Sequence, residues 1–64
     1  MSSNKETLIK RFESTAAHYE RTGKREWAYA KNDLGDEHYG KARKAFDKAK
    51  EYRQKAQDLR NSMK

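Results

Sequence analysis

The side chains that could do chemistry in this sequence are two histidines and a few carboxylates. His38 lies close along the chain to Asp33, Asp36 and Glu37, and such a grouping could ligate a metal ion. A metal site needs three or four ligands that converge on one point. Acidic residues are also favoured at the start of a helix, because they interact with the positive end of its dipole. We therefore expect a helix start here, without a metal or a cofactor.

His18 and three glutamates are the remaining candidates for acid–base catalysis. His18 falls at the border of an apolar helix face, where a histidine is an ordinary surface residue. Glu6, Glu13 and Glu20 would need a cleft to act as general acids or bases, and 64 residues leave little room for one. Glycine-rich phosphate loops and nucleophile elbows are also missing. We expect a protein that is not an enzyme and has no small-molecule substrate.

Composition limits the possible classes of protein further. Charged residues make up 41% of the chain and hydrophobic residues 33%, with a net charge of +6 and no cysteine. No apolar run approaches the ~20 residues of a membrane span, and the N-terminal residues lack the apolar segment of a signal peptide. We expect one small cytoplasmic domain over residues 1–64 that does not enter a membrane.

The pattern of residue types predicts helices throughout. Proline and valine are absent, and no stretch alternates between apolar and polar residues as strands do. Ser3 and Glu6 have the spacing of a capping box, and Gly23 reads as a helix end. Gly35 and Asp36 favour a second break, although the apolar phase continues across them, so that the last two helices could form one. The expected helices span about residues 4–21, 24–33 and 36–62.

The last of these helices has a regular apolar stripe. Small or apolar residues recur every seven positions in two series, which is the pattern of a helix that packs along another helix. The series are Ala42, Ala49, Ala56 and Met63, and Ala45, Tyr52 and Leu59. The predicted fold is all-α: a helical hairpin or a short three-helix bundle with a long C-terminal helix and coiled-coil-like packing.

Charged residues flank this stripe at the same spacing. The excess positive charge lies in residues 41–64, with nine basic and three acidic side chains. Two like copies of this helix would bring like charges together, which disfavours pairing of the stripe with itself alone. Glu6, Glu13 and Glu20 repeat every seven residues on the first helix, so an antiparallel hairpin would set them against one basic flank. The candidate basic contacts are Lys41, Lys48, Lys55, Arg53 and Arg60.

These patterns favour a small helical protein-protein interaction or regulatory protein that self-associates as a homodimer. A first helix that ends near residue 21 is too short to cover the stripe, so part of the stripe should stay exposed and form an interface, centred on Tyr52 and Leu59. Trp27 is expected in the core, and Tyr29 outside it. The alternative is a basic nucleic-acid-binding regulator, since lysines and arginines can contact phosphates. The candidate interface residues are Tyr29, Ala49, Tyr52, Ala56, Leu59 and Met63.

Overall fold

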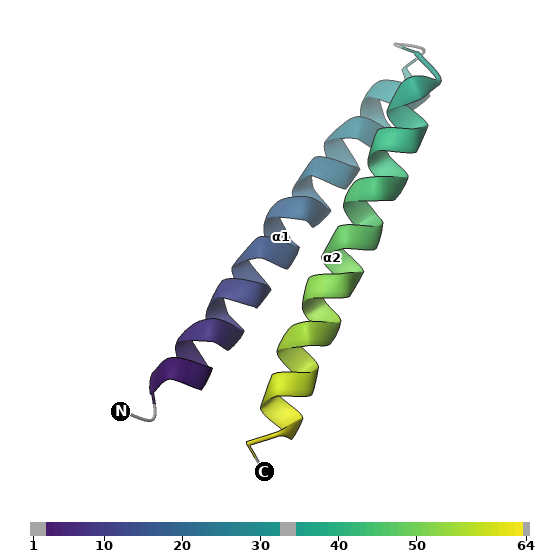
Figure 1. Cartoon of the computed structure of the whole chain (residues 1–64). Helices are drawn as coiled ribbons and strands as arrows, with labels where there is room; N and C mark the ends of the chain where they lie inside the picture. Colours follow the sequence, from purple (N-terminus) through teal and green to yellow (C-terminus); the bar gives the residue numbers. More distant parts are fainter. Residues whose placement is uncertain (1–2, 33–34, 64) are drawn as a thin grey trace.

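The protein is an antiparallel pair of long helices. The structure is a computed structural model, and it describes residues 3–32 and 35–63. Helix α1 spans Ser3–Lys31 and helix α2 spans Glu37–Asn61, and the two run side by side with the termini at the same end (Figure 1). The hairpin measures 50 × 15 × 11 Å. The described residues are helical apart from the turn and the chain ends, as the all-α hairpin prediction requires.

The predicted end of the first helix at Gly23 is wrong. α1 continues through Gly23 to Lys31, so the predicted stretches 4–21 and 24–33 form one helix and there is no three-helix bundle. A Cβ on Gly23 would lie 2.8 Å from the Phe46 ring, which packs directly over this glycine. The glycine makes room for an aromatic ring on the other helix, and this packing outweighs its weak helix propensity. α1, with 29 residues, is also longer than the C-terminal helix α2, with 25.

The second predicted break is where the chain turns. Gly35 has a φ of 125°, which residues with a side chain rarely adopt. Asp36 precedes α2 at the N-cap position, although its side chain makes no capping hydrogen bond. Asp33 and Leu34 lie outside the described residues. At the other end of α1, Ser3 was predicted as the N-cap but already lies within the helix.

Small residues fill the contact between the two helices. Each helix buries one every seven residues, so that the backbones approach closely along the whole hairpin. The series on α2 follows the predicted stripe, whereas the series on α1 passes through the glycine that was expected to end the helix. The buried residues are Ile9, Ala16, Gly23 and Ala30 on α1, and Ala42, Ala45, Ala49 and Ala56 on α2.

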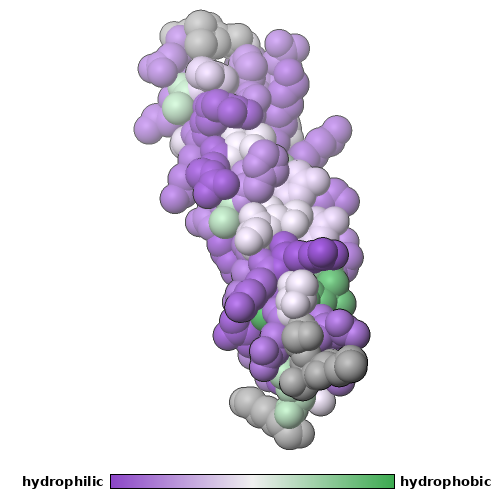
Figure 2. Space-filling model, turned by 90° about the vertical axis from the view of Figure 1, so that its left-hand side faces the viewer, coloured by the Kyte–Doolittle hydropathy of each residue, from purple (hydrophilic) through white to green (hydrophobic). Residues whose placement is uncertain are grey.

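The large side chains lie around this contact rather than within it. Phe12, Tyr19, Tyr52 and Leu59 are half-buried, and several other large apolar residues are more than a third exposed. One long side of the molecule is mainly hydrophilic, with apolar surface only in small separate areas (Figure 2). A hairpin of two helices has no third layer to cover its broad sides, so these sides are where its functional surface must be sought.

Candidate interaction faces

The hairpin has two broad faces, one on each side of the buried contact. Residues seven positions apart lie on the same side of a helix. Each broad face therefore has one series of such residues from α1 and one from α2. The first face, called the Glu–Arg face below, comprises Glu13, Glu20 and Trp27 of α1 and Tyr39, Phe46, Arg53 and Arg60 of α2. The second, called the lysine face, comprises Leu8, Thr15, Thr22 and Tyr29 of α1 and Lys41, Lys48 and Lys55 of α2.

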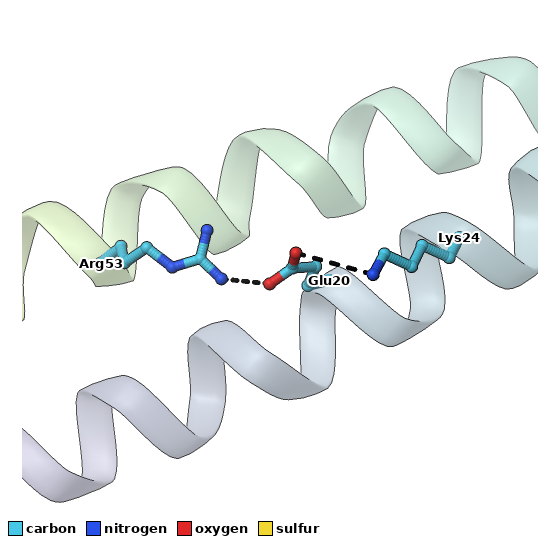
Figure 3. Close-up of polar contacts among 3 residues, drawn as sticks. All are labelled: Glu20, Lys24 and Arg53. Atoms are coloured by element: carbon cyan, nitrogen blue, oxygen red, sulfur yellow. Dashed lines mark hydrogen bonds and ion pairs between the residues drawn. The ribbon is translucent and has the colours of Figure 1, made fainter.

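Two ion pairs between the helices occupy the middle of the Glu–Arg face. Arg60 donates a hydrogen bond to Glu13 with 2.5 Å between Nη2 and Oε2, and Arg53 donates one to Glu20. Lys24, one turn from Glu20 on α1, lies 3.9 Å from the same carboxylate (Figure 3). The acidic series of α1 thus lies against a basic flank of α2, as the charge pattern predicted, and it meets the arginine flank.

These contacts change the acidity of Glu20. The hydrogen bond from Arg53 is the largest cause of a lowered pKa, and the positive charges of Arg53 and then Lys24 act in the same direction. Partial desolvation opposes them weakly. Exposed ion pairs of this kind are screened by water and salt, so each contributes little to stability. Their main effect is to fix the register of one helix along the other.

An aromatic groove lies on the same face, toward the turn. Trp27 packs edge-on against Tyr39, with 5.0 Å between ring centroids. The prediction that Trp27 belongs to the core is wrong, because its side chain remains 48% exposed. Gly23 receives the ring of Phe46, whereas the indole of Trp27 lies against Tyr39 outside the buried contact. The groove has a volume of about 600 Å³ and is lined by Lys24, Trp27, Tyr39, Arg43, Phe46 and Asp47.

A second groove lies at the opposite end of the hairpin from the turn, where α1 begins and α2 ends. Ile9 forms part of its floor and Met63, which is 43% exposed, lies beside it. The groove has a volume of about 380 Å³ and is lined by Glu6, Ile9, Lys10, Glu13, Arg60 and Met63. The Glu–Arg face therefore has apolar side chains beside charged ones at both ends, and ion pairs in the middle.

The lysine face carries positive charge over an aromatic cluster. Tyr52 stacks on Tyr19 with 5.9 Å between centroids and an angle of 7° between the rings, and Phe12 lies 6.0 Å from Tyr52. The ammonium group of Lys55 lies 4.8 Å from the centre of the Tyr52 ring. Glu51 lies 3.7 Å from both Lys48 and Lys55. The cluster holds the two helices together, and part of its positive charge is already balanced.

The predicted interface residues differ in how exposed they are. Ala49 and Ala56 are each 3% exposed between α1 and α2, so a partner cannot reach them. Tyr52 and Leu59 are half-buried within one chain, because α1 is long enough to cover the stripe. Tyr29 is 38% exposed and packs its ring edge-on against His38.

The exposed aromatic residues of the Glu–Arg face were missed by sequence reasoning. Their signal was present, because Trp27 continues the series of Glu13 and Glu20, and Phe46 continues the series of Arg53 and Arg60. A helix that ends at Gly23 would not carry Trp27 on the same face as Glu13 and Glu20. Because α1 is continuous, the three residues lie on one face.

One polar contact lies at the turn end of the hairpin. Nδ1 of His38 is within hydrogen-bonding distance of Glu26 Oε2, and both side chains are largely covered. Among the described residues, no group of three or more histidine and carboxylate side chains is placed to hold a metal ion. Neither helix, over the residues described, is long and apolar enough to cross a membrane.

Comparison with known proteins finds no match to this chain among protein families, curated proteins or solved structures.

Proposed function

We propose that this chain is a small, non-enzymatic helical interaction protein of the cytoplasm, with a regulatory role, that self-associates through its Glu–Arg face. The observation that carries the proposal is the aromatic groove. Trp27, Tyr39 and Phe46 are between 37% and 48% exposed on one side of a chain with few large apolar residues. Aromatic side chains gathered in this way are typical of interface centres.

The energetics of the isolated hairpin support this proposal. Among the described residues, the buried ones are Ile9, alanines and Gly23, and a chain of this size has a marginal core. Covering the aromatic groove would remove several large apolar surfaces from water, at about 25 cal/mol for each Å². Association therefore supplies the apolar burial that the two helices alone do not provide.

The dimensions of the face also fit a stable complex. The broad side of the hairpin measures 50 by 15 Å. A face of that size is close to the ~800 Å² that each partner buries in a standard interface. An interface on the Glu–Arg face therefore needs no additional segment to reach a common size.

Nucleic-acid binding is the second candidate, and the contacts of the basic residues support it less. Four of the five candidate basic contacts already lie within 4 Å of a carboxylate: Arg53, Arg60, Lys48 and Lys55. A carboxylate beside a lysine or arginine reduces the positive potential that attracts phosphates. The observation that keeps this candidate is the net charge of +6.

Sedimentation equilibrium tests the proposal directly. The chain mass is 7.6 kDa, and a homodimer should appear as twice that mass at roughly micromolar concentration, equivalent to about 8 kcal/mol of association free energy. Circular dichroism on the same samples reports helix content. A folded protein that keeps the mass of one chain at all concentrations would contradict self-association.

A further inference from the structure

We propose that the partner on the Glu–Arg face is a second copy of this chain, docked with its turn at the same end, so that the two hairpins form a four-helix bundle around a twofold axis along their length. This arrangement rests on the proposed self-association and adds its geometry. The Glu–Arg face has a pattern of charges that fits its own copy in this orientation and not in the reverse one.

The charges on the face determine which orientation is complementary. The carboxylates of Glu13 and Glu20 lie on α1, and the guanidinium groups of Arg53 and Arg60 lie on α2. A twofold axis parallel to the hairpin places α1 of one copy over α2 of the other. Each glutamate then lies over an arginine of the second copy. The pair Glu13–Arg60 and the pair Glu20–Arg53 each become a group of two glutamates and two arginines.

The apolar ends of the face agree with this orientation. With the turns at the same end, the aromatic groove around Trp27 and Phe46 lies over the same groove of the second copy. The groove containing Ile9 and Met63 likewise lies over its own copy at the other end. The apolar side chains at each end can then meet apolar side chains of the second copy, although charged residues line both grooves as well. The ion pairs in the middle lie over the ion pairs of the second copy.

The reverse orientation lacks the match of charges. A twofold axis across the hairpin places α1 over α1, so that Glu20 lies over Glu13 of the second copy and Arg53 lies over Arg60. Like charges that face each other across an interface disfavour it. In the same orientation, the aromatic groove would lie over the groove that contains Glu6, Ile9 and Met63, so the apolar areas fit both orientations and the charges decide between them.

The lysine face does not fit a second copy in either orientation. Its α2 column carries Lys41, Lys48 and Lys55. The α1 residues of this face contain no carboxylate, because they are Leu8, Thr15, Thr22 and Tyr29. An axis along the hairpin places the lysines over an α1 series without a carboxylate, so that Lys48 and Lys55 gain no countercharge beyond Glu51 of their own helix. An axis across the hairpin places lysines over lysines. The Glu–Arg face is therefore the self-complementary side of the hairpin.

A distance measurement between spin labels tests the orientation. The chain contains no cysteine, so Asp36→Cys creates one labelling site per chain, at an exposed turn residue whose side chain makes no capping bond. With the turns together, the distance between the two labels should be well under half of the 50 Å length of the hairpin. The reverse orientation places the labels at opposite ends, and a distance near 50 Å would overturn the proposal.

A second label separates the possible failures. Lys5→Cys, exposed at the other end of the hairpin, should also give a short distance if the two hairpins run in the same direction. Two long distances would keep self-association and overturn the orientation. An absence of dipolar coupling at both positions, with helix content and the mass of one chain retained, would overturn the self-association itself.

Discussion

The ring of Phe46 on α2 lies directly over Gly23 on α1, and three of its carbons would be within 2.9 Å of a Cβ at that position. A glycine in the middle of a helix costs about 1 kcal/mol relative to alanine. Here that cost is offset by the packing of an aromatic ring against the backbone of the glycine. The contact places the Phe46 ring on the Glu–Arg face, and α1 passes beneath the ring without a break.

A double-mutant cycle tests this contact. Gly23→Ala should stabilise the Phe46→Ala variant by about 1 kcal/mol, because only helix propensity then changes. In the wild-type background the same substitution should stabilise less or should destabilise, since the ring must move. The non-additivity, measured by chemical denaturation, should be at least about 0.5 kcal/mol. Equal effects in both backgrounds would show that the ring does not depend on the glycine.

Gly40 provides the matched control for Gly23. It lies in α2, and a Cβ there would meet nothing within 4 Å. Gly40→Ala should therefore stabilise the hairpin by about 1 kcal/mol, which is a rise of roughly 4–8 °C in melting temperature for a chain of this size. A fall in melting temperature would indicate a neighbour that the hairpin does not show.

Gly35 should respond in the opposite way. Its φ of 125° is strained for any residue with a side chain, so Gly35→Ala should destabilise the hairpin by more than about 1 kcal/mol. Thermal melts of the Gly35 and Gly40 variants, followed by circular dichroism, give the comparison. A neutral Gly35→Ala would mean that the turn relaxes into a different backbone conformation.

The contact between Glu20 and Arg53 should give the hairpin an acid-dependent component of stability. The pKa of Glu20 is lowered from its ordinary value of 4.5 in the folded chain. A lowered pKa means that this stability is present above pH 4.5 and is lost as the pH falls through the folded-state pKa. The Glu20→Gln variant should therefore lose less stability than the wild type between pH 5 and the folded-state pKa.

Nuclear magnetic resonance titration of the Glu20 carboxyl group checks the cause. Its midpoint should lie below 4.5 in the wild type and should return toward 4.5 in Arg53→Gln, because the hydrogen bond from Arg53 is the main cause of the shift. An unchanged midpoint in Arg53→Gln would remove Arg53 as that cause.

Sequence reasoning predicted the helical class and the side of α2 that is buried, because a seven-residue repeat of alanines depends on local spacing alone. It also predicted that the glutamates of α1 would meet a basic flank. It failed at Gly23, because the neighbouring sequence does not distinguish a glycine that ends a helix from a glycine inside a helix that packs under an aromatic ring. The position of Trp27 could not be derived, since it depends on that continuity and on Phe46, which lies far away in the sequence.

Nucleic-acid binding should be weak and non-specific. Charge reversal of Lys48 and Lys55 to glutamate removes two of the candidate phosphate contacts. If the lysine face binds phosphates, these changes should weaken binding to duplex DNA and reduce its dependence on salt. We expect little binding of the wild type near physiological salt, measured by fluorescence anisotropy. Strong, salt-dependent binding that both reversals abolish would favour the nucleic-acid candidate over self-association.

A comparison of Trp27→Asp with Tyr29→Asp, by sedimentation equilibrium, tests the central claim most directly. Both residues are exposed aromatic residues near the turn end of α1, at 48% and 38%, but Trp27 lies on the Glu–Arg face and Tyr29 on the lysine face. A charge introduced into an interface centre should weaken the dimer by a factor of at least about ten, or about 1.4 kcal/mol. We predict a monomer for Trp27→Asp and a dimer for Tyr29→Asp, with helix content retained in both. A Trp27→Asp variant that dimerises as strongly as the wild type would contradict the assignment of the Glu–Arg face, and a monomeric Tyr29→Asp would place the interface on the lysine face instead.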